Sequence, residues 1–119
     1  MTDQPKLPHH EINYIEITVP EVAAAKRFYG RAFGWEFNDY GPTYAGIKKQ
    51  SGGEVGGFTE GERVTGGPLL VLFSQDLESS RNEVQQAGGK LTRDIFSFPG
   101  GRRFQFTDPF GNELAVWSY

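Results

Sequence analysis

The spacing of the apolar residues changes at Pro20, and this change constrains the fold more than any other feature of the sequence. Before the proline, residues 12–19 alternate between apolar and polar side chains, which is the period-two pattern of a β-strand. After it, apolar residues recur at intervals of three and four over residues 22–33, and Gly34 follows. This spacing predicts an amphipathic helix that ends in a left-handed glycine cap.

The same order of elements is expected again in the second half of the chain. Residues 69–73 form an apolar strand, Asp76 suits a helix N-cap, and two glycines at 88–89 can end the helix that follows. Turn residues, mostly glycine and proline, separate the remaining apolar runs. The strands expected after the two helices are residues 43–49 and 54–60 in the first half, and residues 90–98, 102–107 and 113–118 in the second.

A weak internal repeat relates the two halves. Shifting the sequence by 55 residues places Val22 on Leu77 and Gly34 on Gly89. Because composition alone can produce such coincidences, the repeat suggests two copies of a βαβββ unit without establishing them.

Length and composition limit the classes of function. The 119 residues suit one domain at residues 11–119, with modules at about 11–66 and 67–119, and the proline-bearing residues 1–10 are expected to form a flexible tail. With 12 basic and 15 acidic residues and a net charge of -3, the chain lacks the basic patches that bind nucleic acid. Its longest apolar run is too short to cross a membrane, and without cysteine it forms no disulfide. We expect no nucleic-acid or membrane partner and a cytoplasmic location.

Several motifs, taken in order, resemble the glyoxalase/bleomycin-resistance/dioxygenase family, also called the vicinal oxygen chelate family. The strand at residues 15–21, the Phe-Tyr pair at 28–29 and Phe-Gly-Trp at 33–35 are similar to its first module. Ala-Gly-Gly at 87–89 and Asp-Pro-Phe-Gly-Asn at 108–112 are similar to its second. The resemblance implies an α+β fold in which two βαβββ modules form an open, barrel-like mixed sheet, with helices outside and a ligand cleft on the concave face.

Metalloenzymes of this family hold a divalent metal on His, Gln or Glu side chains, and the resemblance allows these positions to be checked. They fall on Tyr14, Leu69, Ala115 and a residue within 57–60, where only Glu60 has a carboxylate. Leucine and alanine cannot coordinate a metal, and a catalytic site needs three or more protein ligands. We therefore expect no metal at this site and no other cofactor.

The only histidines are His9 and His10. Adjacent imidazoles could share a metal with Glu11, but metal-binding histidines usually have an orienting partner, which the expected tail does not supply. We favour a flexible tail.

Strand alternation places Tyr14 and Glu16 on the face opposite the isoleucines, toward the expected cleft. Glu16 could act there as a general base, with Tyr14 as a donor to a developing oxyanion. Alternatively, Glu16 bonds a neighbouring strand or pairs with Arg102 or Arg103 and only stabilises the fold. We favour the second interpretation, because structural pairs involve carboxylates as readily as catalysis does.

Aromatic residues on or beside the expected strands complete the candidate site. Small ligands are held in apolar pockets with a few polar groups. Core packing or a dimer contact explains each ring equally well when it is taken alone. The candidate ligand-binding residues are Tyr14, Glu16, Tyr44, Phe58, Phe104, Phe106 and Trp117.

Three functions remain open. The favoured one is metal-independent binding of a small, partly apolar molecule by a homodimer. The second is a metal-independent lyase or isomerase that uses Glu16 as its general base. The third is a degenerate family member that acts as an interaction module.

Overall fold

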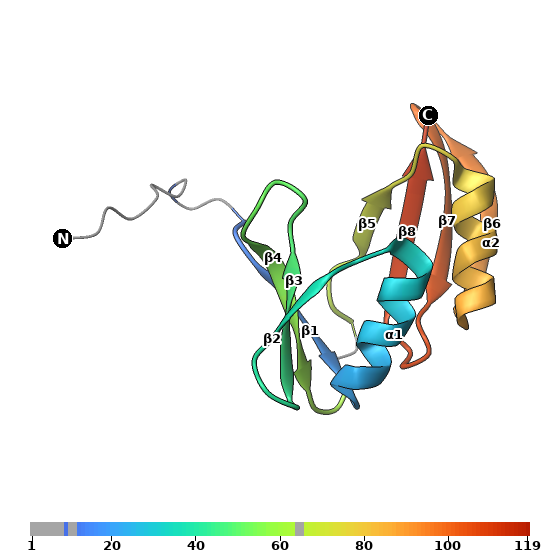
Figure 1. Ribbon diagram of the computed structural model, residues 1–119. Helices are drawn as coiled ribbons and strands as arrows, with labels where there is room; N and C mark the ends of the chain where they lie inside the picture. The colour runs from blue at the N-terminus through green and yellow to red at the C-terminus, as the bar shows by residue number, and fades with distance from the viewer. Residues whose placement is uncertain (1–8, 10–11, 64–65) are drawn as a thin grey trace.

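The computed structural model describes residues 9, 12–63 and 66–119 (Figure 1). Two helices and eight strands follow one another along the chain. They are β1 (Ile15–Val19), α1 (Val22–Phe33), β2 (Phe37–Asp39), β3 (Tyr44–Lys48), β4 (Glu54–Glu60), β5 (Leu70–Phe73), α2 (Leu77–Ala87), β6 (Lys90–Phe98), β7 (Gly101–Thr107) and β8 (Glu113–Ser118).

The strands form two four-stranded mixed sheets with the same topology. The first sheet has the order β1-β4-β3-β2 and the second the order β5-β8-β7-β6. In each sheet the strand before the helix pairs in parallel with the last strand of its unit, and the other pairs are antiparallel. The sheets do not close on each other (Figure 1). This arrangement confirms the predicted α+β fold of two βαβββ units.

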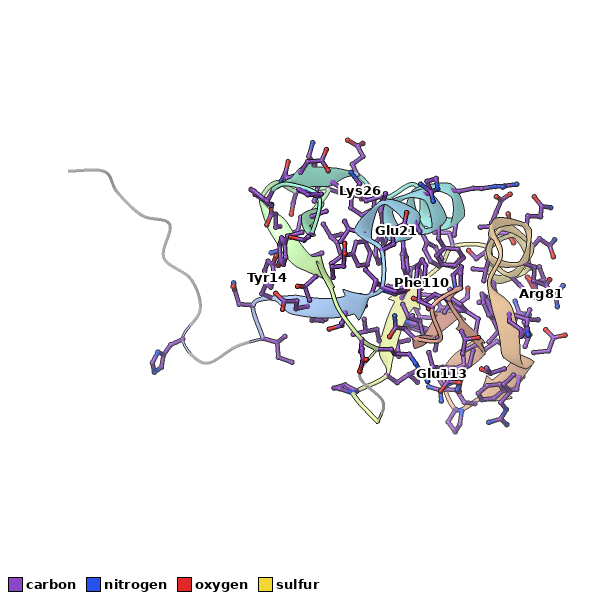
Figure 2. All side chains as sticks on the ribbon, turned by 90° about the horizontal axis from the view of Figure 1, so that it is seen from below. Tyr14, Glu21, Lys26, Arg81, Phe110 and Glu113 are labelled. Carbon is purple, nitrogen blue, oxygen red and sulfur yellow. The ribbon has the colours of Figure 1, made fainter. Side chains whose placement is uncertain are left out.

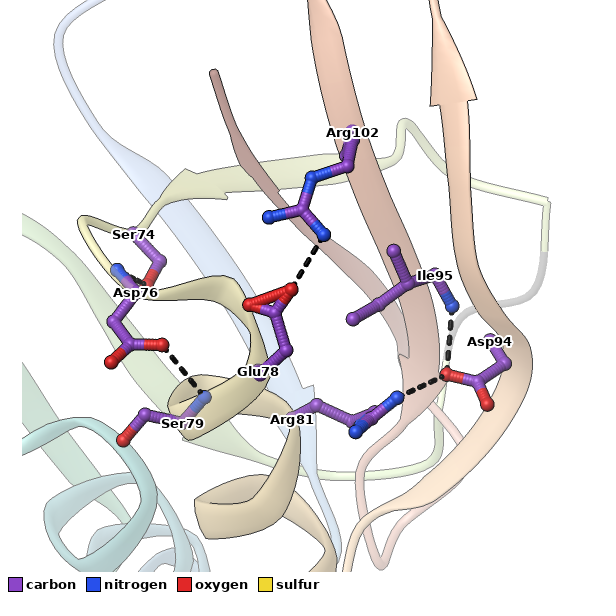
Figure 3. A network of polar contacts seen from close by, with 8 residues as sticks. All are labelled: Ser74, Asp76, Glu78, Ser79, Arg81, Asp94, Ile95 and Arg102. Atoms are coloured by element: carbon purple, nitrogen blue, oxygen red, sulfur yellow. Dashed lines mark hydrogen bonds and ion pairs between the residues drawn. The ribbon is translucent and has the colours of Figure 1, made fainter.

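The helix ends follow the signals read from the sequence. Gly34 adopts a left-handed conformation with φ 71° after α1, and Gly88 does so with φ 112° after α2. The Asp76 side chain accepts a hydrogen bond from the Ser79 backbone N–H at 3.1 Å, so it caps α2 as expected (Figure 3). None of the helices in the described part of the chain is long and apolar enough to span a membrane.

Helix α1 packs against both sheets. Its Tyr29 ring lies 5.2 Å from Phe58 of the first sheet, and its Phe28 ring lies 6.4 Å from Phe106 of the second. These four side chains belong to one hydrophobic core. The sides of the two sheets that carry the core residues therefore both face α1.

A buried hydrogen bond ties α1 to the second sheet. The Tyr29 hydroxyl donates to the Asp108 carboxylate at 2.9 Å, and only 3% of Asp108 is exposed. Asp108 also accepts from the backbone N–H groups of Phe110 and Asn112, at 2.9 and 2.8 Å. Burial, followed by the charge of Asp108, raises the pKa of Tyr29 far above its ordinary value, so its hydroxyl stays a donor. The turn at residues 108–112 is thereby anchored to α1.

Two differences from the sequence expectations have simple causes. The short strand β2 was not predicted, because three residues are too few to show a period. Strand β1 begins at Ile15 rather than at residue 12, because its pairing with β4 begins at Ile15 and Gly56. The division into modules near residue 66 stays a prediction.

The buried bond predicts a stability effect. Replacing Tyr29→Phe leaves a buried carboxylate with one partner fewer, so we expect the free energy of unfolding to fall by about 1–3 kcal/mol. Tyr119→Phe changes a hydroxyl on a side chain that is 82% exposed and serves as the matched control, with an expected change within about 0.5 kcal/mol. Urea denaturation measures both. Equal midpoints for the two variants would contradict this role of Tyr29.

Candidate functional site

The first sheet presents a polar face on the side away from α1. Along β1, Ile17 and Val19 are buried in the core, whereas Glu16, which precedes Ile17, is exposed. Glu16 lies opposite Gly57 in the parallel pairing with β4, and Gly57 lies opposite Gly46 of β3. Tyrosine and glutamate side chains gather over these glycines. We call this surface the tyrosine–glutamate face, and its members are Tyr14, Glu16, Tyr40, Tyr44 and Glu54.

A chain of hydrogen bonds joins three of the predicted site residues. The hydroxyl oxygens of Tyr14 and Tyr44 lie 2.5 Å apart, and the Tyr44 hydroxyl donates to Glu16 at 3.1 Å. The Tyr44 hydroxyl has one proton and donates it to Glu16, so in the bond between the two hydroxyls Tyr14 is the donor and Tyr44 the acceptor. Burial, and then the bonds to Tyr14 and Glu16, raise the pKa of Tyr44 well above its ordinary value. Tyr44 therefore stays protonated and can hold Glu16 in place.

This chain of hydrogen bonds needs a glycine beneath it. A Cβ atom on Gly57 would lie 2.3 Å from the Tyr44 hydroxyl oxygen and 2.6 Å from that of Tyr14. Any side chain at this position would push the two phenols off the strand. Gly57 thus permits the phenols to lie directly over the backbone.

A second polar group extends the face towards β2. Glu54 accepts hydrogen bonds from the Tyr40 hydroxyl at 2.5 Å and from the Asn38 side chain at 2.8 Å. The bond from Tyr40, followed by that from Asn38, lowers the pKa of Glu54 below its ordinary value. The Tyr40 and Tyr44 rings are 6.2 Å apart, which joins this group to the first. The sequence did not predict Asn38, Tyr40 and Glu54 as site residues. They lie in or beside β2 or at the start of β4, where the pattern of apolar residues does not show which side of the sheet a residue faces.

Trp117 lies on a different surface. Its ring is 5.2 Å from Phe73 and 6.3 Å from Phe98, on the side of the second sheet away from the core. We call this surface the arginine–aromatic face, and its members are Phe73, Arg93, Phe96, Phe98, Arg103 and Trp117. No hydrogen bond, ion pair or ring contact among the described residues joins it to the tyrosine–glutamate face. Figure 2 shows Tyr14 beside the first sheet and Glu113, which begins β8, on the second.

Phe58, Phe104 and Phe106 are placed differently from the expectation that they line the cleft. All three are 0% exposed and belong to the hydrophobic core. Strand alternation explains this, because Gly57 takes the polar face and Phe58 must then point to the opposite side, where it lies beside Tyr29. These rings stabilise the packing of α1, and the structure brings together only Tyr14, Glu16 and Tyr44 of the expected set.

Glu16 does not pair with Arg102 or Arg103, which was one of the alternatives considered for it. Arg102 donates to Glu78 of α2 at 2.5 Å, and Arg103 belongs to the arginine–aromatic face (Figure 3). The hydrogen-bond partner of Glu16 is instead Tyr44, from β3 of its own sheet.

The positions that match metal ligands in the family do not form a ligand set. Tyr14 is engaged with Tyr44, Ala115 is a buried methyl group, and Leu69 precedes β5. Glu60 pairs with Val19 at the far end of β1 from Tyr14. Among residues 12–63, 66–119 and residue 9, no three His, Cys, Asp or Glu side chains cluster closely enough to hold a metal ion. His10 and Glu11, considered above as ligands, lie outside the described residues.

Comparison with known proteins identifies the family. The sequence model of the Glyoxalase/Bleomycin resistance protein/Dioxygenase superfamily matches residues 11–116. The chain therefore belongs to this superfamily, as its motifs indicated. None of the curated proteins compared with the chain matches it in sequence.

Solved structures share the fold. A glyoxalase-related enzyme from Fulvimarina pelagi is similar with a TM-score of 0.77 and 23% identity, over 92% of this chain and 88% of that chain. A glyoxalase/bleomycin resistance protein/dioxygenase family enzyme from Burkholderia phytofirmans PsJN gives 0.77 and 17%, over 91% and 98%. TioX from Micromonospora sp. ML1 gives 0.69 and 16%, over 91% and 98%. At these identities the likeness extends to the fold alone.

The bonds to Glu54 predict a titration effect. Its lowered pKa means that its contribution to stability is present above the ordinary glutamate pKa and is lost as the pH falls through the lowered one. Tyr40→Phe removes the largest cause, so we expect the titration midpoint of Glu54 to move up towards its ordinary value. A ¹³C NMR titration of the carboxyl groups measures this shift. Asp94 is the internal control, because the Ile95 N–H and Arg81 lower its pKa independently of Tyr40. A Glu54 midpoint that does not move would refute the assignment.

Proposed function

We propose that the protein binds a small, partly apolar molecule on the tyrosine–glutamate face, without a metal ion. The single observation that supports this is the chain of hydrogen bonds from Tyr14 through Tyr44 to Glu16. These bonds fix two phenols and a carboxylate on an exposed surface over Gly57. Small-molecule sites use such fixed polar groups, beside aromatic surface, to orient the ligand. A metal-independent site also agrees with the lack of suitable donors at the family's ligand positions. A cytoplasmic location stays a proposal drawn from the sequence.

A metal-independent lyase or isomerase is the second candidate. The observation that favours it is the contact of Glu16 with a phenol, because a carboxylate can take a proton while a nearby hydroxyl donates to developing negative charge. Here Glu16 is the candidate general base and Tyr14 is the candidate donor, which would turn its hydroxyl proton from Tyr44 to the substrate. A turnover assay on the bound compounds distinguishes this candidate from binding alone.

Screening by thermal shift tests the proposed binding site. A ligand of the native state raises the melting temperature, so we expect hits from a library of small aromatic and aliphatic molecules. Loss of one hydrogen bond from a fixed network should weaken a hit by about 5- to 30-fold, so we expect this loss of affinity in Glu16→Gln and Tyr44→Phe. Glu83→Gln, on the exposed side of α2, should leave the affinity unchanged.

The screen also separates the alternatives. Hits that bind all variants equally would place the site elsewhere and sink the proposal. A complete absence of hits would favour an interaction module. Turnover that Glu16→Ala abolishes while binding persists would establish the enzyme.

We further propose that the protein is a homodimer in which the tyrosine–glutamate face of one copy meets the arginine–aromatic face of the other, with the ligand held between the two faces. Within the described residues, neither Glu16 nor Glu54 forms an ion pair, and neither do Arg93 and Arg103. The Arg103 Nε atom is buried without a hydrogen-bond partner there. Opposite unpaired charges on two faces of one chain suit a two-fold dimer, because the symmetry then forms the same contact between the two faces twice.

The proposed dimer predicts a charge-dependent association. Arg103→Glu places like charges in contact and should raise the dimer dissociation constant at least about tenfold, measured by sedimentation equilibrium at low salt. Arg31→Glu makes the same charge change on the exposed side of α1 and should leave association as it is. A monomeric wild type, or equal effects of both variants, would refute this interface.

A further inference from the structure

A groove separate from the tyrosine–glutamate face lies between the two modules. It has a volume of about 790 Å³, within the roughly 300–1,000 Å³ of small-molecule pockets. The end of α1 and the residues after it form one wall, β5 forms the other, and the hairpin that follows β3 forms the rim. No member of the tyrosine–glutamate face lines it, so an occupant of the groove would be additional to the ligand proposed above.

The wall on the α1 side is aromatic and rigid. Phe33 and Trp35 are half-buried, and their rings are 5.8 Å apart. The Trp35 ring stacks at 4.8 Å on Tyr29, which is itself fixed by Asp108. On the β5 side, 46% of Val71 is exposed. A ligand in the groove would therefore meet apolar surface that is already held in position.

The rim of the groove carries positive charge. Lys48 and Lys49 both line it and are exposed, and neither forms an ion pair in the part of the chain that the structure describes. Lys26, by contrast, lies 2.6 Å from Asp39. Glu36 is the one acidic residue among the groove's lining residues, so the lining keeps an excess of positive charge.

Two serines also line the groove. The hydroxyl oxygens of Ser74 and Ser80 lie 2.6 Å apart, and Ser74 also accepts from the Asp76 backbone N–H at 3.0 Å (Figure 3 shows Ser74 beside Asp76). These hydroxyls already bond each other. The two lysines are thus the cationic groups of the groove that remain available to a ligand.

We propose that this groove binds a small amphipathic carboxylate. The apolar body of the ligand packs against Phe33 and Trp35, and its carboxylate lies between the ammonium groups of Lys48 and Lys49. Burial of the apolar body drives binding, and the lysines select the negative charge over a neutral or positive head group.

Three probes with the same ten-carbon chain test the selection. Decanoate, decan-1-ol and decyltrimethylammonium are titrated, below their micelle concentrations, into the ¹⁵N-labelled protein, and amide shifts are followed by NMR. We expect decanoate to shift residues 33–36, 48–50 and 71–74 and to bind at least about tenfold more tightly than the other two. Lys48→Glu with Lys49→Glu should remove this preference and leave decan-1-ol binding unchanged. Arg27→Glu with Lys90→Glu makes the same charge change outside the groove and should keep it.

A second variant tests occupancy of the groove without changing its charge. Val71→Trp fills the groove from the exposed β5 side and should weaken all three probes. Equal affinity for the three probes in wild type, or shifts confined to the tyrosine–glutamate face, would overturn the proposal. So would a preference for decanoate that survives the lysine variant, or binding that survives Val71→Trp. None of these results bears on ligand binding at Glu16 and Tyr44, which the thermal-shift variants test separately.

Discussion

The buried hydrogen bond between Tyr29 and Asp108 is the contact on which the arrangement of the two modules depends. It joins α1 of the first βαβββ unit to the turn before β8 of the second, at a place where an unpaired carboxylate would be costly. Because α1 is held against the second sheet while its aromatic residues pack on the first, both core-bearing sides turn towards this helix. The two remaining sides, one rich in tyrosine and glutamate and one in arginine and aromatic rings, face away from the core.

This orientation leaves the polar side chains of the first sheet exposed and held in fixed positions. The hydrogen-bonded tyrosines and Glu16 lie over glycines, so their positions are fixed by backbone geometry as much as by their own contacts. Fixed groups lose little freedom when a ligand binds, which favours binding. The superfamily contains enzymes as well as other members, and the fold alone does not choose between these functions. The function proposed for this chain therefore uses phenols and a carboxylate rather than a metal ion.

Much of the fold could be predicted because its signals are local. The helix ends at Gly34 and Asp76 follow from left-handed glycine and side-chain capping, and both are confirmed. The site was harder to predict than the fold. Alternation along a strand divides its residues between two sides of the sheet but does not say which side meets a helix. Tyr14 and Glu16 were assigned to the polar face, whereas Phe58, Phe104 and Phe106 were assigned to the wrong one. Phe58 is next to Gly57, and only the contacts between the strands and α1 reveal that the glycine lies on the side away from the helix. Tyr40 and Glu54 depend on the unpredicted strand β2.

A high-resolution crystal structure of the protein as purified would show directly what the tyrosine–glutamate face binds. We expect density for a co-purified small molecule, or for one of the compounds found by screening, to lie over Gly57 within hydrogen-bond distance of Tyr44 or Glu16. A stoichiometric divalent metal held by side chains between the sheets, or ligand density found only away from this face, would contradict it.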